Sequence, residues 1–447
     1  MKCLSLILAL AFVCFLSEAQ VSIPPAKMEN HPDYAAYQRA KQGKDHNAAL
    51  RAAANLIETY PGNSVAFQLA AASFYDINKP QDAADFVQWS VAYNSYDNVS
   101  SFYGFIFSVF ANRPNEVQQY VRTMQNVGKA PADMQRDYQS MSGYLNSLAG
   151  YPDLSATVQK AKGYLANYNE EGVKRAKAAY ENLASTLGAS YDGIANNETA
   201  AQTLADWVKA EEAVKQGLIS RMMYVEALVN IAKISETVNF EFGQKLEPHL
   251  EKIVFDQTNY NLASRYRAYE RLAKVQSAMK RWDKVEASSN LIISDLSGKL
   301  PSTATLAKAY FYLVMAKTES RNYKDASALA DVYARQLPKL KSPEYLAEAY
   351  YVILRAYAFN KEIDKAQAIA SQAENFLKTP GIDQMNYVSY VKNGLSSVAN
   401  LLDNETVAST RNAYNDGVRL MEQKKYAESA VQFEKARAEE VAILDKM

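Results

Sequence analysis

Apolar residues along most of the chain recur with the three-to-four-residue spacing of amphipathic helices, and short polar breaks separate these segments. No stretch of useful length alternates apolar and polar residues in the way a half-buried strand does. Helix-breaking prolines fall in the breaks, namely Pro61, Pro80, Pro114, Pro131, Pro152, Pro301, Pro338 and Pro380. The segment 153–247 contains no proline. The pattern predicts an all-α protein whose middle differs from both flanks.

The helical segments repeat near the amino terminus with a period of 34 residues. Ala49, Ala83 and Val117 mark equivalent points at this spacing, and Pro61 closes the first unit. A pair of helices of this length carries apolar residues on both sides and cannot bury them alone, so neighbouring pairs must stack. The period therefore predicts three stacked helical hairpins over residues 33–130.

These hairpins resemble tetratricopeptide repeats, in which small residues stand where the two helices touch and a proline follows the second helix. The matching residues are Tyr37, Ala40, Ala49, Ala53 and Pro61 in the first hairpin and Ala71, Phe74, Ala83 and Val87 in the second. The resemblance implies an α-solenoid, an elongated right-handed superhelix of stacked hairpins. The first helix of each hairpin forms the inner surface of such a superhelix, and this surface suits extended peptides or partner helices.

The carboxyl-terminal part, residues 261–447, repeats more loosely. The segments 281–285, 321–326 and 361–366 recur at 41 and then 40 residues and are similar to the turn between the two helices of a tetratricopeptide hairpin. The unit 413–436 fits the repeat best. Residues 131–260 keep helical patterns without a repeat register, and we expect a helical middle block of degenerate repeats there.

The resemblance also implies which side chains line the inner surface. The fifth position of the first helix is aromatic in five of the seven units compared, and the chain as a whole contains 31 tyrosines. Aromatic rings offer large, stiff contact area at small entropic cost, but they also pack against neighbouring repeats, so both roles stay open. The predicted partner-binding residues are Tyr34, Gln38, Lys41, Gln68, Tyr75, Phe102, Ile106, Phe311, Met315, Tyr351, Arg355 and Tyr414.

The first nineteen residues have the pattern of a secretory signal. A basic start at Lys2 precedes an apolar run over residues 4–16, and the small-residue pattern 17–19 comes before Gln20. The apolar run is shorter than the roughly 20 residues that a membrane-spanning helix needs. We therefore expect cleavage after residue 19, a short leader over residues 20–32, and an exported protein, periplasmic or secreted, without an integral membrane segment.

Cysteine and charge narrow the function further. Cys14 stands where a bacterial lipoprotein carries its lipidated cysteine, but the bulky Val13 before it argues against lipidation. Cys3 also falls in the signal, so the mature chain is expected to contain no thiol and no disulfide. The 49 basic and 49 acidic residues balance, which makes nucleic acid and anionic membranes poor candidate partners.

Signals of catalysis are weak. Three histidines occur, and none lies at metal-ligand spacing from another: His31, His46 and His249. Within the segment 247–251, Glu247 and Glu251 share a helix face while His249 points about 200° away, so we interpret the cluster as a solvated helix start. Glycine-rich phosphate loops and nucleophile elbows do not occur. The sequence predicts no metal and no cofactor.

Two other classes remain as alternatives. All-helical toroids of about this length include glycosidases that need only two carboxylates, although sugar clefts are commonly lined by tryptophan and this chain has three. A solute-capturing surface protein could also use a helical frame. The leading hypothesis is an exported, non-catalytic scaffold that binds a protein partner or an extended peptide, with its oligomeric state left open.

Overall fold

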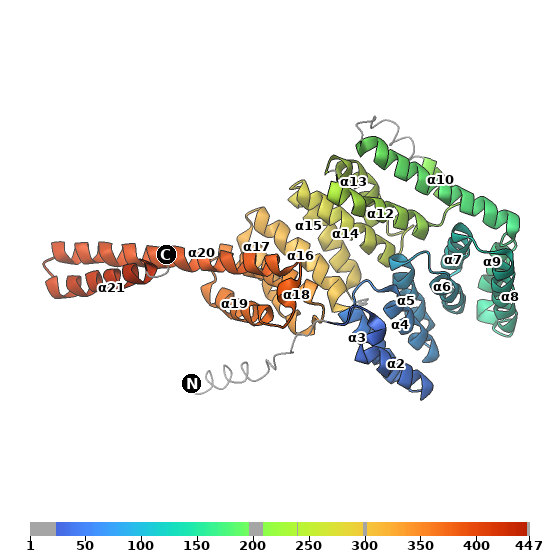
Figure 1. Cartoon of the computed structure of the whole chain (residues 1–447), viewed down its shortest axis with the longest axis horizontal. Helices are drawn as coiled ribbons and strands as arrows, with labels where there is room; N and C mark the ends of the chain where they lie inside the picture. Colours follow the sequence, from blue (N-terminus) through green and yellow to red (C-terminus); the bar gives the residue numbers. More distant parts are fainter. Residues whose placement is uncertain (1–23, 196–208, 239, 298–301, 445–447) are drawn as a thin grey trace. The chain divides into compact units, whose positions relative to one another are not determined.

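The computed structural model describes residues 24–195, 209–238, 240–297 and 302–444 (Figure 1). Within these ranges the regular structure consists of α-helices and short 3-10 helices, and no strand occurs. The prediction of an all-α fold built from helical hairpins in the manner of an α-solenoid is confirmed. The predicted signal, residues 1–19, and the first four residues of the leader lie outside the described ranges. No helix of the described chain is long and apolar enough to cross a membrane.

Within the described residues, most of the consecutive helices pair as antiparallel neighbours, and the first three hairpins do so most regularly. The first three hairpins are α2 (Pro32–Gln42) with α3 (His46–Thr59), α4 (Ser64–Asp76) with α5 (Pro80–Tyr93), and α6 (Asn98–Phe110) with α7 (Pro114–Val127). The middle helices are α8 (Pro131–Ser147), α9 (Ser155–Leu165), α10 (Glu170–Ala195), α12 (Arg221–Val238) and α13 (Phe240–Phe255). They are followed by α14 (Leu262–Ala278), α15 (Trp282–Leu296), α16 (Thr303–Glu319), α17 (Tyr323–Ala334), α18 (Pro343–Phe359), α19 (Ile363–Leu377), α20 (Val388–Glu422) and α21 (Tyr426–Leu444). With 26 residues, α10 is too long to keep a 34-residue spacing.

Seven hairpins share one turn geometry. In each turn a residue other than glycine adopts the left-handed conformation with φ between 58° and 63°: Lys44, Asn78, Asn112, Lys280, Arg321, Lys361 and Lys424. The N–H of the next residue donates to the carbonyl five residues earlier, as from Lys79 to Phe74 and from Lys425 to Leu420, both at 2.9 Å. This Schellman-type turn closes the first helix and starts the second. The three predicted turn segments of the carboxyl-terminal part lie at these positions.

Side-chain caps and prolines fix where several helices begin. The Asp45 carboxylate accepts from the Ala48 N–H at 2.9 Å and starts α3, and Asn63 does the same for α4. Pro80 and Pro114 stand at the first position of α5 and α7, where a missing N–H costs nothing. The 34-residue period of the sequence is thus a period of helix starts.

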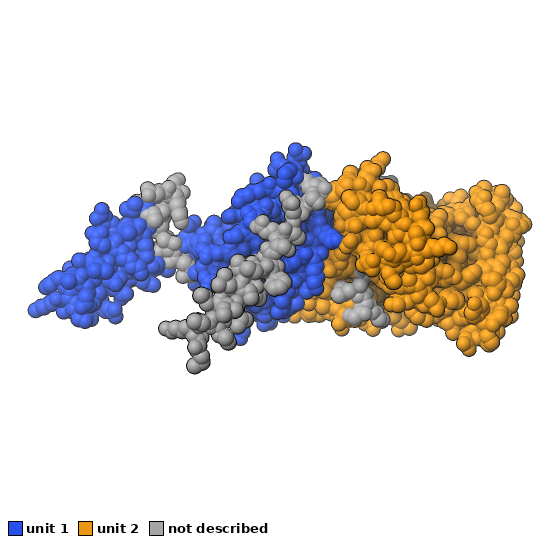
Figure 2. All heavy atoms as spheres, turned by 90° about the horizontal axis from the view of Figure 1, so that it is seen from below, with its two compact units in different colours: residues 1–23, 313–447 blue, residues 24–312 orange. Residues whose placement is uncertain are grey.

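The chain divides into two compact units, and each is described by itself (Figure 2). Unit 2 spans residues 24–312, and unit 1 contains residues 313–447. In unit 2, α12 and α14 pack against the second helices α5 and α7. Trp89 of α5 lies 5.3 Å from Tyr266 of α14 between ring centroids, and the Arg267 side chain donates to the Ala92 carbonyl at 3.2 Å. The second helices α5 and α7 are therefore covered, while the first helices α2, α4 and α6 make no comparable contact with α12 or α14.

Unit 1 is built around α18, whose residues are buried along almost their whole length. The neighbouring helices α17, α19 and α20 pack against it. The helix α20 has 35 residues, about twice the length of the other first helices, and α21 returns along its second half. The terminal hairpin thus extends beyond α18 and α19.

Candidate partner-binding surface

The first helices of unit 2 bring seven of the predicted residues to one side of three consecutive hairpins. Tyr34, Gln38 and Lys41 lie on α2, Gln68 and Tyr75 on α4, and Phe102 and Ile106 on α6. Gln38 is exposed and the other six are half-buried. We call this surface, with the aromatic residues Tyr103, Phe110, Tyr144 and Tyr151 described next, the first-helix face.

The rings of the first-helix face contact one another from helix to helix. Tyr75 lies 4.9 Å from Phe107 and 5.7 Å from Phe110 between ring centroids. Phe110 in turn lies 6.4 Å from Tyr151, which follows α8 and is exposed. Tyr103 stacks on Phe107 at 5.5 Å. Because most of these rings are only partly buried, each packs on the core with one side and keeps another side open.

The helix α8 extends this surface through a hydroxyl group. Tyr144 donates from its hydroxyl to the Ile106 carbonyl at 3.3 Å. Burial, together with the nearby Tyr75 hydroxyl, raises the pKa of Tyr144 well above its usual value, so the hydroxyl stays protonated as a donor. Tyr103, Phe110, Tyr144 and Tyr151 were not among the residues predicted from the sequence. Tyr103 and Phe110 lie on the same first helix as Phe102, so their positions could have been read from the repeat. Tyr144 and Tyr151 could not, because α8 lies in the block without a repeat register.

An ion pair joins the first two hairpins at the edge of the face. The Lys41 ammonium contacts the Asp76 carboxylate, and His46 Nδ1 lies 3.4 Å from the same carboxylate. Lys41, predicted to contact a partner, therefore holds the end of α2 against the end of α4. An amine with this fixed partner is less available to an incoming ligand than the exposed amide of Gln38.

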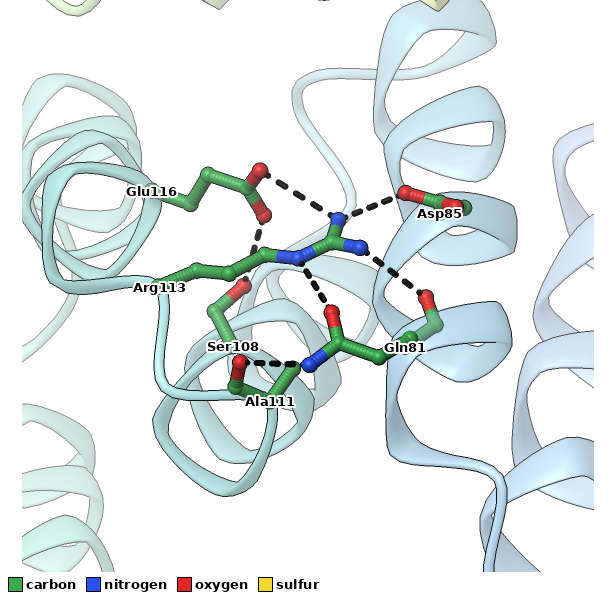
Figure 3. A network of polar contacts seen from close by, with 6 residues as sticks. All are labelled: Gln81, Asp85, Ser108, Ala111, Arg113 and Glu116. Atoms are coloured by element: carbon green, nitrogen blue, oxygen red, sulfur yellow. Dashed lines mark hydrogen bonds and ion pairs between the residues drawn. The ribbon is translucent and has the colours of Figure 1, made fainter. Parts of the chain in front are cut away.

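A polar network fixes the second hairpin to the third (Figure 3). Arg113, in the turn before α7, pairs with Asp85 of α5 at 2.5 Å and donates from Nε to the Gln81 amide oxygen at 2.9 Å. The Gln81 amide donates to the Ala111 carbonyl at 2.8 Å. Glu116 completes the network by accepting from Ser108 at 3.1 Å. The network therefore joins α5 to the turn between α6 and α7 and holds the second hairpin against the third.

The charged groups of this network are partly buried, and burial affects the pKa of each. Burial would lower the pKa of Arg113, but the hydrogen bond to Asp85 and the neighbouring carboxylates outweigh it and raise that pKa. Burial raises the pKa of Glu116 above its ordinary value in spite of the opposing Arg113 charge. The Arg113 guanidinium therefore stays charged. The ionised form of Glu116 is destabilised by burial.

Two predicted residues of unit 1, Tyr351 and Arg355, form a separate cluster. Arg355 of α18 donates to the Tyr351 hydroxyl at 2.7 Å and pairs with Glu319 of α16 at 2.7 Å. Its guanidinium also lies 5.1 Å from the centroid of the Tyr351 ring, which contacts Tyr390 of α20 at 5.5 Å. Met315 lies on α16 and is half-buried. These contacts fix Tyr351 and Arg355 within unit 1.

Two predicted aromatic residues differ in exposure. Phe311 is 5% exposed and contacts Tyr312 at 5.1 Å, so it presents almost no surface to a partner in this structure. Tyr414 on α20 is 56% exposed and meets Phe433 of α21 at 5.5 Å. The twelve predicted residues are therefore distributed over the first-helix face, the Arg355 cluster, a buried position and the terminal hairpin.

The acidic cluster around His249 does not converge on one point. Glu247 of α13 is buried, contacts Arg281 and lies 3.1 Å from Lys284. His249 has a different partner, because its Nδ1 lies 3.2 Å from Glu211. The interpretation of a solvated helix start is wrong, because Glu247 points into the contact between α13 and the turn before α15. Among the described residues, no group of three or more His, Cys, Asp and Glu side chains could hold a metal ion.

The class defined by these features is an α-solenoid of tetratricopeptide-like hairpins. No protein-family model matches the chain, and no curated protein matches it. Among solved structures, the chain is similar to the crystal structure of the P58(IPK) TPR domain, with 12% identity over 83% of this chain and 98% of that chain, at a TM-score of 0.25. A TM-score this low does not by itself support a shared fold. The likeness to tetratricopeptide repeats therefore rests on the 34-residue period and on the seven turns.

Proposed function

We propose that the chain is an exported, non-catalytic scaffold that binds a protein partner or an extended peptide through the first-helix face. The observation that carries this proposal is the difference between the two sides of the first three hairpins. The second helices α5 and α7 are covered by α12 and α14, whereas the first helices carry half-exposed aromatic rings in mutual contact. Contiguous apolar surface of this kind on a folded unit is typical of interaction sites.

The chemistry of the face favours an extended segment with apolar side chains. Tyr75, Phe102 and Ile106 offer apolar area, and the amides of Gln38 and Gln68 can donate to and accept from a peptide backbone. Lys41 is neutralised by Asp76, so the face has no strong excess of either charge. Recognition would therefore depend on shape and aromatic contact more than on electrostatic steering.

Crosslinking in cells followed by mass spectrometry tests the proposal. A double variant, Tyr34→Ser with Phe102→Ser, removes one half-exposed ring from the first hairpin and one from the third hairpin of the face. Loss of two aromatic contacts is expected to weaken binding of the partner at least about tenfold. Phe255→Ser is the matched control, because Phe255 is an exposed aromatic residue of α13 in the same unit.

The outcomes separate clearly once circular dichroism shows that all variants are folded. Loss of one defined partner from the double variant, and its retention by the control, supports the first-helix face. If the wild type captures no partner, or if the double variant keeps it unchanged, the proposal is wrong. The export part is tested separately by the amino terminus of the protein recovered outside the cytoplasm, which should be Gln20.

A further inference from the structure

A groove runs along unit 1 between α19 and the first part of α20, with a volume of about 620 Å³. Its walls repeat at helical spacing on both sides: Gln367, Ala370, Ser371 and Glu374 on α19, and Leu395, Ser396, Val398, Ala399 and Leu402 on α20. Two parallel stripes with spacings of three and four residues are what a third helix packs against. In a regular hairpin the second helix would lie here, but α20 continues for 35 residues before it turns.

The helix α21 has a second apolar side. Ser429 and Ala436 are buried against α20, whereas a stripe on the opposite side is exposed. The stripe repeats at spacings of four and three residues and consists of Ala427, Val431, Glu434, Ala438 and Val441. Val431 is 65% exposed and Val441 is 49% exposed. A solvated helix should be polar on its outer side, so four apolar residues of five predict a further packing contact.

This stripe cannot reach the groove of its own chain while α20 remains one helix. Ser409 and Thr410 of α20 hold Glu439 at 3.0 and 3.2 Å, so α21 lies along the second part of α20. The groove lies near residue 398, and the middle of the part covered by α21 lies near residue 412, about 21 Å further along the helix at 1.5 Å per residue. The groove and the stripe therefore lie at different heights along the same helix, α20.

We propose that a second copy of this chain supplies the missing helix: α21 of each copy lies in the groove between α19 and α20 of the other. Two antiparallel α20 helices related by a twofold axis place each groove opposite the partner's stripe, which is the isologous arrangement that closes as a dimer. The small residues Ala427 and Ala438 allow close helix approach. The Leu395 and Leu402 side chains fill the spaces between them.

Charge supports the same partner. Residues 408–440 contain six basic and six acidic residues, so the terminal hairpin offers no net charge to a nucleic acid or to a strongly charged protein. The groove wall carries one charged residue, Glu374, and α21 carries the exposed Lys435 and Arg437 beside the stripe. Arg437 pairs with Glu434 of the stripe, so Lys435 is the cation that would face Glu374 at the edge of the contact. The proposal does not rest on the first-helix face, which belongs to unit 2.

Disulfide formation between differently substituted chains tests the contact directly. In a background with Cys3→Ser and Cys14→Ser, which removes both natural thiols, one protein carries Ala399→Cys and the other Val431→Cys. Mixing the two under mild oxidation should give a disulfide-linked pair, and neither protein alone should crosslink. Val99→Cys, at an exposed position in unit 2, replaces Val431→Cys in the control and should not crosslink with Ala399→Cys. Absence of the mixed disulfide overturns the proposal, as does an intrachain disulfide in a monomer that carries both cysteines.

Sedimentation velocity measures the dimer without a covalent bond. The full chain is expected to sediment as a dimer, and Val431→Glu should raise its dissociation constant at least about tenfold, because a carboxylate would enter the apolar contact beside Glu374. Val99→Glu makes the same substitution at a residue that is 55% exposed in unit 2 and should leave the dimer intact. A wild-type monomer at about 100 μM, or equal effects of the two substitutions, would contradict the proposal.

Discussion

The third hairpin, α6 with α7, and the terminal hairpin, α20 with α21, share the same internal contact. In both, a glycine of the first helix faces the ring of an aromatic residue sixteen positions later, Gly104 with Tyr120 and Gly417 with Phe433. The turns agree as well, since each contains a left-handed residue and the same backbone hydrogen bond. Local structure is therefore the same at both places.

Burial is where the two hairpins differ. Tyr120 of α7 is fully buried against α6, in a core that also includes residues of α5 and of the middle helices, while Phe433 stays half-buried and Tyr426 is exposed. The hairpin sequence specifies its turn and its inner contact, and neighbouring hairpins supply the rest of the core. A terminal hairpin without a neighbour keeps an apolar side open.

The largest expected difference between the hairpins comes from Gly104→Ala compared with Gly417→Ala. A Cβ at residue 104 would overlap the fully buried Tyr120 ring, and we expect a loss of about 2–3 kcal/mol in the free energy of unfolding. A Cβ at residue 417 would lie 2.8 Å from Phe433, which can turn outward, so the loss should stay below about 1 kcal/mol. Urea unfolding followed by circular dichroism measures both. Equal losses would mean that the terminal hairpin is packed as tightly as the third.

A smaller difference is expected from removing one arginine in each hairpin. Arg113→Ala breaks the network that ties the third hairpin to the second and leaves Glu116 without its cation, at a cost of about 1–2 kcal/mol. Among the described residues Arg437 pairs with Glu434 on an exposed helix surface, and Arg437→Ala should change stability by less than about 0.5 kcal/mol. Thermal unfolding of both variants beside the wild type provides the measurement. A loss of similar size from Arg437→Ala would show that α21 is held by more than α20.

The same contrast explains which parts of the structure could be predicted from the sequence. The turns were predictable because a turn depends on a few neighbouring residues, as in Tyr323 followed by Ala326, and because stacked hairpins repeat those residues at a fixed period. Tyr34, Tyr75 and Phe102 could be placed on first helices for the same reason. These are local features that one hairpin carries with it.

Contacts between distant parts of the chain could not be predicted in this way. Trp89 meets Tyr266 across 177 residues, and no spacing in the sequence relates α5 to α14. The burial of Phe311 and of Glu247 likewise depends on which helix comes to lie against them. Their residue types alone allow both an exposed and a buried role.

Glycine substitutions in the turns test whether local structure is equal in the two hairpins. Lys424→Gly relieves the strain of a left-handed lysine and should stabilise its hairpin by about 1 kcal/mol. Asn112→Gly should instead lose about 1 kcal/mol, because asparagine tolerates this conformation and its side chain accepts from the buried Thr157 hydroxyl. Amide hydrogen exchange of α21 and of α7 reports each change locally. Slower exchange in α21 and faster exchange in α7 are expected, and slower exchange in both hairpins would show that the contact with Thr157 adds nothing to stability.

The smallest expected effect concerns pH and is specific to the third hairpin. Burial raises the pKa of Glu116 in the folded protein above its unfolded value, so the stability linked to its proton is fully present below about pH 4.5 and is lost as the pH rises through the folded pKa. Glu116→Gln keeps the neutral form at every pH. The free energy of unfolding of Glu116→Gln relative to the wild type should therefore rise by a few tenths of a kcal/mol between about pH 4 and pH 7. Urea unfolding at each pH measures this difference. Glu434→Gln in the exposed part of α21 is the matched control and should leave the midpoints nearly unchanged. A relative fall for Glu116→Gln over this range would mean that the pairing with Arg113 outweighs the cost of burial.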